Sequence, residues 1–483
     1  MTTGLAPAPP RLPLRLAGAA LAVAAGSVTA AVVVGAADPI LVVSGVAALA
    51  AAAAVMLHPE AGLPIIAVFA VLRLADVATD FHGAPSTFTP LVALLFAAVF
   101  VRWLTTGRRP AGSGRVALLM GPFVLVAVGS LVWATDAATS TRAAEFLLKD
   151  AVVAVIAGFL LHRASDLTRV VWTIVVAGGA VATITAAQFL LGAFGTSVFG
   201  LAQSDVLNIV GSVDDVRISG PVGDPNFYAQ LLVMVFPLAY ERWRRAPTAA
   251  GRAVGAWATL ATGASTVFTF SRGGAVALVI VAVIVLARFR PSKSLIVGVI
   301  AAAVLVLPLL PPGYVERLTA LDQVGSVNAT MDASIRGRTA VVRAGAAMFM
   351  DRPLLGIGFG GFGDTYPSYA RDLGIELRSE SREAHNLYVE IASETGLAGI
   401  AAFAVLAIGT AAAIRSSRRR FRSVGRTDLD GIAYAIGAAL VGYLLTSMFL
   451  HMAFARFVWL LVGIAVALPN VATRLEQEEP AWT

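Results

Sequence analysis

The sequence contains no cysteine and only two lysines, Lys149 and Lys293, among its 483 residues. The lack of cysteine excludes disulfide bonds, thiol nucleophiles and cysteine-based metal sites. Charged residues make up 13% of the chain and hydrophobic residues 58%, whereas soluble globular proteins contain about 25% charged residues. The net charge of +7 is spread over short clusters between apolar runs. This distribution argues against a nucleic-acid partner and predicts a multi-pass membrane protein with the lipid bilayer as its surroundings.

Long apolar runs dominate what is present. A transmembrane helix needs about 20 such residues, and the runs predict an all-α, polytopic membrane helix bundle of about 12–14 transmembrane helices. The candidate spans are 14–37, 39–58, 62–77, 86–104, 115–134, 145–163, 168–193, 225–242, 249–270, 272–289, 294–311, 394–414, 430–450 and 453–470. The third span is short and contains Arg73 and Asp76. We therefore expect it to be tilted or re-entrant.

The charges in the loops predict the orientation, because cytoplasmic loops are enriched in Lys and Arg. With the N-terminus inside, the loops 102–115, 162–169, 242–252, 288–293 and 415–426 also fall inside, and all five are basic. The segments around 76–80, 205–224 and 312–394 fall outside and are mixed or acidic. We expect a cytoplasmic (inner) membrane protein with both termini in the cytoplasm and one large extracytoplasmic loop that contains short helices.

Four regions follow from this topology. Residues 1–13 are a Pro-rich, disordered cytoplasmic N-terminus, and 14–209 are N-terminal transmembrane helices. Residues 210–470 form a core that includes the extracytoplasmic loop 312–394, and 471–483 form a cytoplasmic tail. The first apolar run continues directly into a second, so we expect a retained helix rather than a cleaved signal peptide.

Arginines and one histidine gather on the predicted outer side. They are Arg217, Arg272, Arg338 with Arg336 beside it, and His385. Guanidinium groups bind phosphate or diphosphate through forked hydrogen bonds, and a histidine with a pKa near 6.5 can accept a proton at neutral pH. This combination predicts catalysis on a phosphate-bearing lipid. A snorkelling arginine and a structural histidine are the simpler alternatives.

The glycine-rich run from Gly356 to Gly361 matches the spacing of dinucleotide-binding loops. It follows a predicted helix rather than a strand, so we interpret it as a tight return of the loop toward the membrane. No spacing of His, Asp and Glu indicates a zinc site, and the outer carboxylates permit a divalent cation without requiring one. No cofactor is expected.

The motifs from Arg217 onward resemble, in their order, those of the O-antigen ligase and O-antigen polymerase superfamily over roughly residues 210–470. The matching segments are Arg217-Ile-Ser-Gly220, Pro225-Asn-Phe227, Phe270-Ser-Arg-Gly-Gly274, Arg338, the run from Asp351 to Phe362, Ala384-His-Asn-Leu-Tyr-Val-Glu390 and Glu394-Thr-Gly-Leu-Ala-Gly399. Members of this family are integral membrane glycosyltransferases that take a glycan from an undecaprenyl diphosphate carrier. Ligases pass it to a lipid A core, and polymerases pass it to another carrier-linked repeat.

The resemblance implies a role for each matching residue. Arg272 and Arg338 would hold the diphosphate of the donor, and His385 would accept the proton of the acceptor hydroxyl. The residues implied in substrate binding are Arg217, Arg336, Asn386, Tyr388 and Glu390. The transfer would be inverting and would use neither a nucleotide sugar nor a metal. The acceptor, a glycan or a glycolipid, is left open, and with it the choice between ligase and polymerase.

Two other classes of function remain open. A transporter or flippase of lipid-linked glycans would need charged residues deep in the helices, and the charges in the predicted spans lie near their ends. A non-catalytic scaffold would use the large loop to bind a partner. Replacement of His385 by Ala separates both from a transferase, since only transfer should collapse.

Overall fold

The computed structural model describes residue 55 and residues 59–106, 113–209, 213–290, 333–375, 382–451 and 456–478. The predicted N-terminus 1–13, the spans 14–37 and 294–311, and nearly all of span 39–58 lie outside these residues. Each of the other predicted spans coincides with a helix. The predicted all-α membrane bundle is therefore confirmed.

The first half of the described chain contains six α-helices. They are α3 (Gly62–Leu72), α4 (Leu74–His82), α5 (Phe88–Thr106), α6 (Ser113–Gly129), α7 (Ala137–Leu160) and α8 (Ala164–Leu190), with short 3-10 turns η1 (Pro59–Ala61) and η2 (Ser130–Val132). Helices α3 and α4 bend by 49° at Arg73, which has a left-handed backbone with φ of 48°. The short charged span is thus a broken helix, in line with the tilted or re-entrant segment predicted there.

The middle of the chain begins with an element that the all-α prediction did not include. Strands β1 (Gln203–Ile209) and β2 (Val213–Gly220) pair antiparallel, with Asp205 opposite Arg217. Their mutual hydrogen bonds satisfy backbone groups that a loop would have left to water. The sequence predicts a polar loop in this stretch, and the hairpin corrects that prediction, because pairing between two short charged segments leaves no local strand pattern.

Helix α9 (Pro225–Arg245) lies at the centre of the bundle and packs against α8, α10 (Ala249–Phe268), α11 (Arg272–Arg288) and α17 (Thr427–Thr446). Asp224 caps the start of this helix. Its side chain accepts hydrogen bonds from the backbone N–H groups of Asn226 and Phe227, at 2.7 and 3.0 Å. Pro225 at the first helical position has the fixed φ that a helix needs. The hairpin therefore leads directly into a helix that is buried along most of its length.

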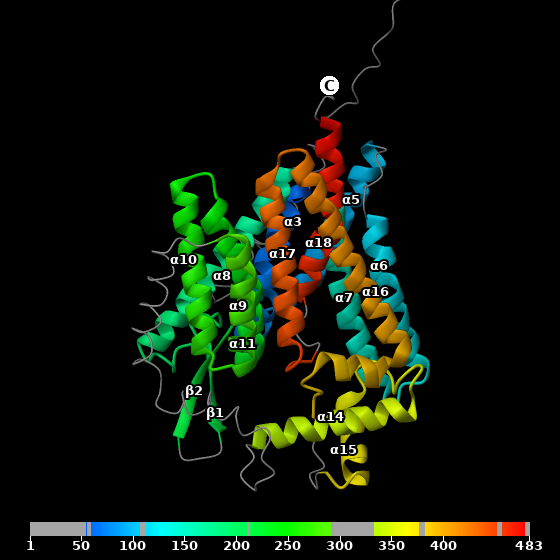
Figure 1. The fold of residues 1–483 in the computed structure, drawn as a ribbon. Coiled ribbons are helices and arrows are strands. Elements are labelled where there is room, and N and C mark those ends of the chain that lie inside the picture. Colours follow the sequence, from blue (N-terminus) through cyan, green and yellow to red (C-terminus); the bar gives the residue numbers. More distant parts are fainter. Residues whose placement is uncertain are drawn as a thin grey trace, which may run out of the picture.

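The C-terminal part contains α14 (Ala333–Asp351), α15 (Phe362–Asp372), α16 (Leu387–Ser423), α17 and α18 (Arg456–Glu478). Figure 1 shows α14 lying across one end of the bundle, with α15 and the β-hairpin at the same end and the C-terminal end of α18 at the opposite end. Helix α18 continues past residue 471, where the tail was predicted to begin. Among the described helices, five are long and apolar enough to cross a membrane, and the bent pair α3–α4 adds a sixth.

The glycine-rich run docks against a break in α16. The break is at Gly396, which has φ of 61°, and the backbone N–H groups of the two following residues donate to the carbonyl oxygens of Pro353 and Leu354 at 2.8 and 3.1 Å. On the other side, the N–H of Phe359 donates to Ser130 Oγ at 2.8 Å. The run therefore ties the loop to α16 and to the end of α6, as a tight return of the loop requires.

Candidate functional site

Arg217 lies on β2 and joins the hairpin to the helices beside it. Its side chain is only 7% exposed. Nε donates to the carbonyl oxygen of Thr269 at 2.7 Å, and Nη2 donates to Asn226 Oδ1 at 3.1 Å. The guanidinium thus connects β2 with the start of α9 and the turn between α10 and α11. These contacts position that turn, and the predicted role in substrate binding stays a prediction.

Arg272 is the first residue of α11, three residues after Thr269. The hydroxyl of Ser271 caps this helix by accepting from the N–H of Gly274 at 3.2 Å, so Arg272 sits in the first turn of α11. Such a helix start favours anions. At the neighbouring Gly273, a Cβ atom would lie 2.6 Å from the Phe449 ring. The first turn of α11 therefore packs tightly on Phe449.

Arg338 reaches the same ring from the loop. It lies in the second turn of α14, which crosses the end of the bundle (Figure 1), and its guanidinium carbon is 5.6 Å from the centre of the Phe449 ring. The side chain of Arg336, one of the predicted substrate-binding residues, lies outside the described part of the structure. Phe449 is thus a shared neighbour of Arg338 and of the turn that carries Arg272.

His385 lies just before α16 in a left-handed backbone conformation, with φ of 45°. It is exposed at this end of the bundle. Its pKa is lowered from the ordinary value of 6.5, mainly because surrounding protein atoms reduce the hydration of the ring. The positive charge of Arg338 lowers this pKa further, whereas the carboxylate of Asp224 opposes the shift. The imidazole is therefore neutral near pH 7, as a proton acceptor must be.

His451, which the sequence analysis did not select, lies against His385. The two ring centres are 5.6 Å apart in an edge-to-face arrangement, and the His451 ring also meets Phe227 edge to face at 5.1 Å. Burial lowers the pKa of His451 to about 4, and His385 acts in the same direction. Its Nδ1 atom is buried and finds no hydrogen-bond partner in the described part of the chain. Its place between two predicted spans at the outer side was the signal available in the sequence.

Asn386 and Tyr388 make structural contacts. Asn386 caps α16 through Oδ1, and its Nδ2 donates to the carbonyl oxygen of Met448 at 3.1 Å. Tyr388 donates its hydroxyl to the carbonyl oxygen of Leu444 at 2.7 Å. Both residues thus fasten the start of α16 to the end of α17. Their predicted roles in substrate binding stay untested beside these contacts.

Glu390 faces a second space, a polar cavity of about 660 Å³ between α3–α4, α7, α9, α16 and α18. His451 and Phe227 also line it, so the cavity borders the two histidines. Glu394 lines it as well and accepts hydrogen bonds from the N–H groups of Gly360 and Phe362 at 2.7 and 3.0 Å. Of the predicted loop residues, Arg338 therefore lies at the Phe449 ring, whereas Glu390 lines this cavity.

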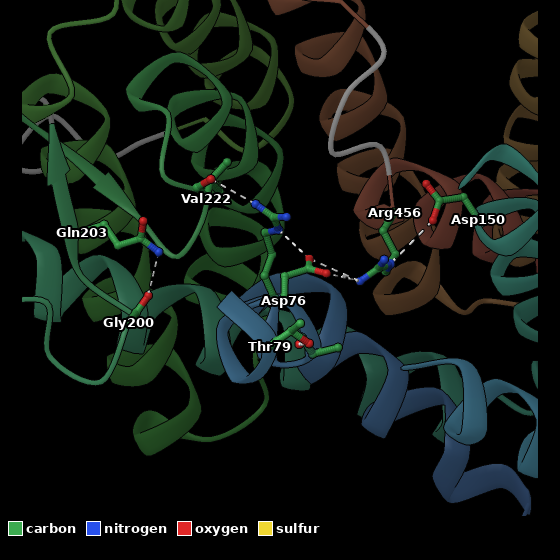
Figure 2. Close-up of polar contacts among 9 residues, drawn as sticks. Asp76, Thr79, Asp150, Gly200, Gln203, Val222 and Arg456 are labelled. Carbon is green, nitrogen blue, oxygen red and sulfur yellow. Dashed lines mark hydrogen bonds and ion pairs between the residues drawn. The ribbon is translucent and has the colours of Figure 1, made fainter. Parts of the chain in front are cut away.

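Figure 2 shows a chain of polar contacts between residues that line the cavity. Arg73 donates to the carbonyl oxygen of Val222 at 3.0 Å and to Asp76 at 2.8 Å. Arg456 lies between Asp76, at 3.4 Å, and Asp150, at 3.5 Å. The residues come from the α3–α4 break, α7, α18 and the turn before α9. The network explains how charges within predicted spans are tolerated, since each one is paired.

Residues 257–404 match the family described as O-antigen ligase. The matched stretch runs from α10 to α16 and includes Arg272, Arg338 and His385. The chain carries an O-antigen ligase domain. This confirms the resemblance to the superfamily of O-antigen ligases and polymerases, and it indicates an enzyme that joins or polymerises glycans.

Other comparisons add less. No curated protein matches the chain. A solved chain from a peptidoglycan synthase complex that coordinates polymerization and crosslinking is 18% identical over 75% of this chain and 98% of that chain, with a TM-score of 0.39.

Several residues around the site lie outside the O-antigen ligase domain. Arg217 precedes the matched stretch, His451 follows it, and the residues of the polar network lie before or after it. The matched stretch therefore contains Arg272, Arg338 and His385, while the surrounding helices of this multi-pass membrane protein complete their environment.

Proposed function

We propose that this protein transfers a glycan from an undecaprenyl diphosphate carrier to a sugar hydroxyl of an acceptor, at the outer face of the cytoplasmic membrane. The observation that carries the proposal is the meeting of two distant segments on one ring: the first turn of α11, with Arg272, and Arg338 of α14 both lie against Phe449. His385 lies close enough to Arg338 for that charge to affect its pKa. Two arginines on segments that meet at Phe449, with a neutral imidazole near one of them, suit diphosphate departure coupled to proton transfer.

The reaction is a direct displacement. The acceptor oxygen attacks the anomeric carbon, and the bond from that carbon to the diphosphate oxygen breaks, so its electron pair leaves with the diphosphate. The proton of the acceptor hydroxyl passes to His385. Arg272 and Arg338 stabilise the charge that grows on the leaving diphosphate, and this kind of electrostatic help often dominates catalysis. Attack from the opposite face gives inversion, and neither a metal nor a nucleotide sugar is required.

The arrangement of the bundle supports an extracytoplasmic site. Helix α14 and the β-hairpin lie at the end of the bundle opposite the C-terminal end of α18 (Figure 1). The connection between α16 and α17, with its cluster of arginines in 415–426, lies at the same end as the C-terminal end of α18. Basic loops face the cytoplasm. The site then faces a compartment without nucleotide sugars, where a preactivated lipid donor supplies the energy.

The test is a cell-free assay with purified protein, carrier-linked glycan and a panel of acceptors. We expect wild-type protein to release undecaprenyl diphosphate together with an elongated or lipid-linked product. The His385→Ala variant should lose about 10²–10⁴-fold in rate, the usual contribution of general base catalysis. The matched control is His82→Ala, since His82 lies at the end of α4, with a ring nitrogen 3.3 Å from the carbonyl oxygen of Phe199, and should keep full activity.

Two results would contradict the proposal. One is the absence of diphosphate carrier release by wild-type protein with every acceptor tested. The other is an unchanged rate for His385→Ala, which would favour the alternative, a flippase of lipid-linked glycans. Product analysis then separates the two kinds of transferase: a ligase needs a glycolipid acceptor, whereas a polymerase uses a second carrier-linked repeat.

A further inference from the structure

The polar cavity beside the two histidines is large enough for a ligand. Its volume is about 660 Å³, within the range of about 300–1,000 Å³ typical of small-molecule sites. Its walls come from α3–α4, α7, α9, the start of α16 and α18. The network of Arg73, Asp76, Arg456 and Asp150 fixes one wall through four polar contacts, one of which joins Arg73 to the carbonyl oxygen of Val222 (Figure 2). Arg456 is held further by its position over the Phe88 ring, at 3.9 Å.

The charge of the lining distinguishes this cavity from the part of the site that contains Arg272 and Arg338. Six carboxylate residues line it against three arginines, Arg73, Arg142 and Arg456. The carboxylate residues are Asp76, Asp80, Asp150, Glu383, Glu390 and Glu394. An excess of carboxylates disfavours a diphosphate, because like charges in a partly dehydrated space repel each other. The same oxygens are strong acceptors for hydroxyl groups, which points to an uncharged, hydroxyl-rich ligand.

Aromatic rings complete the lining. The aromatic residues are Phe146, Phe227, Phe359, Phe457 and Trp459. Rings of this kind offer flat apolar surfaces of the type that covers the C–H face of a sugar, while the carboxylates reach its hydroxyl edge. Carboxylates and aromatic rings in one cavity therefore fit a glycan better than a lipid tail or an ion.

His451 connects the cavity with the proposed base, His385. This residue lines the cavity, and its ring lies edge to face with His385 at 5.6 Å between centres. Arg338 lies against the Phe449 ring, and the lining of the cavity includes neither that ring nor Arg272 and Arg338. A glycan that fills the cavity would thus present its end to the proposed base without occupying the place of the diphosphate.

We propose that this cavity binds the acceptor glycan and directs one of its hydroxyl groups toward His385. The inference rests on the proposed transferase function and assigns a role to Arg73, Asp76, Asp150 and Arg456, which the motifs of the O-antigen ligase domain do not include. Glu390 gains a specific place in it, as a substrate-binding carboxylate on the acceptor side.

The test measures transfer kinetics on full-length protein while acceptor and donor concentrations are varied separately. One variant, Asp76→Asn, removes a charged acceptor of hydroxyl hydrogen bonds from the wall. A second, Thr139→Trp, fills the cavity without removing a charge, since Thr139 lines it. We expect each variant to raise the KM for the acceptor about tenfold or more, the loss expected for one charged hydrogen bond, and to leave the KM for the donor unchanged.

Matched controls lie outside the cavity. Thr141→Trp places the same side chain two residues along α7, at an exposed position. Asp166→Asn removes a buried carboxylate that pairs with Arg169 in the first turn of α8. Both should keep the wild-type KM for the acceptor. A monodisperse profile and an unchanged melting temperature establish that each protein is folded. If Asp76→Asn fails to fold, Thr139→Trp alone decides.

Equilibrium binding separates this inference from the proposed function. The probe is glycan released by mild acid from the carrier lipids of the cells that make the protein, titrated against full-length protein. Wild-type binding that is weakened in Thr139→Trp but not in Thr141→Trp supports the cavity, with or without transfer. Wild-type transfer with an unchanged acceptor KM in both cavity variants would overturn the inference and leave the function standing. A raised donor KM in place of a raised acceptor KM would overturn it as well.

Discussion

Replacement of His451 by Gln should change how the stability of this protein depends on pH. The pKa of His451 is about 4 in the folded protein because the ring is buried, against an ordinary value of 6.5. The unfolded chain therefore binds a proton on this side chain below pH 6.5, while the folded chain stays neutral until about pH 4. Folding stability is lost as the pH falls between these two values and is unaffected above pH 6.5.

The magnitude follows from the two pKa values. At 1.4 kcal/mol per pH unit, their difference corresponds to about 3 kcal/mol of unfolding free energy lost by pH 4. The side chain is only 14% exposed, so solvent screening reduces this figure little. Glutamine carries no charge at any of these pH values. We expect the difference in unfolding free energy between wild type and His451→Gln to shift by about 3 kcal/mol in favour of the variant between pH 7 and pH 4.

Reversible unfolding in mixed detergent micelles, followed by tryptophan fluorescence from pH 8 to pH 4, measures this difference. The range from pH 7 to pH 8 is an internal control, because the two curves should run parallel there. Parallel curves down to pH 4 would refute the reasoning, since they would mean that His451 is protonated as easily in the folded protein as in the unfolded chain.

Three further outcomes follow from the site and from the break in α16. In Arg338→Gln, the acid limb of the kcat/KM profile should move to higher pH, because Arg338 helps to lower the pKa of His385; an unmoved limb would contradict this. In Arg217→Lys, a single ammonium nitrogen replaces the two separate donor atoms, Nε and Nη2, that hold Thr269 and Asn226. The unfolding free energy should therefore fall by about 1–3 kcal/mol, and an unchanged value would show that the forked contact is dispensable. Gly396→Ala should destabilise the protein more than Gly425→Ala in a thermal unfolding assay. Both glycines have positive φ, but only at Gly396 would a Cβ atom meet backbone atoms of Leu354. Equal losses of stability in the two variants would exclude that clash.

Much of the fold was predictable because lipid leaves the backbone few choices. Backbone groups in hydrocarbon must be satisfied within the segment, so an apolar run of sufficient length becomes a helix. Local signals also placed the helix starts: Asp224 before Pro225, and Ser271 before Arg272. The β-hairpin was missed because its pairing depends on contacts between two short polar segments, which carry no comparable local signal.

The site was only partly predictable for a related reason. Arg272, Arg338 and His385 stood out from the sequence as polar residues in an apolar chain, and their motifs resembled a family. His451 had no motif, and its importance depends on the position of its ring against His385. The same holds for Asn386 and Tyr388, whose contacts with the end of α17 no spacing revealed.

Hydropathy, charge and motif order are properties of the chain, so they are enough to indicate a multi-pass helical membrane protein with an O-antigen ligase domain and a polar loop rich in candidate residues. Which of those residues meet depends on how the helices pack. Arg73 and Asp76 pair with each other along the chain, but the contacts of Arg456 with Asp76 and with Asp150 join residues more than 300 positions apart. Helix packing, which the sequence does not display locally, brings these groups together and creates the cavity beside His385.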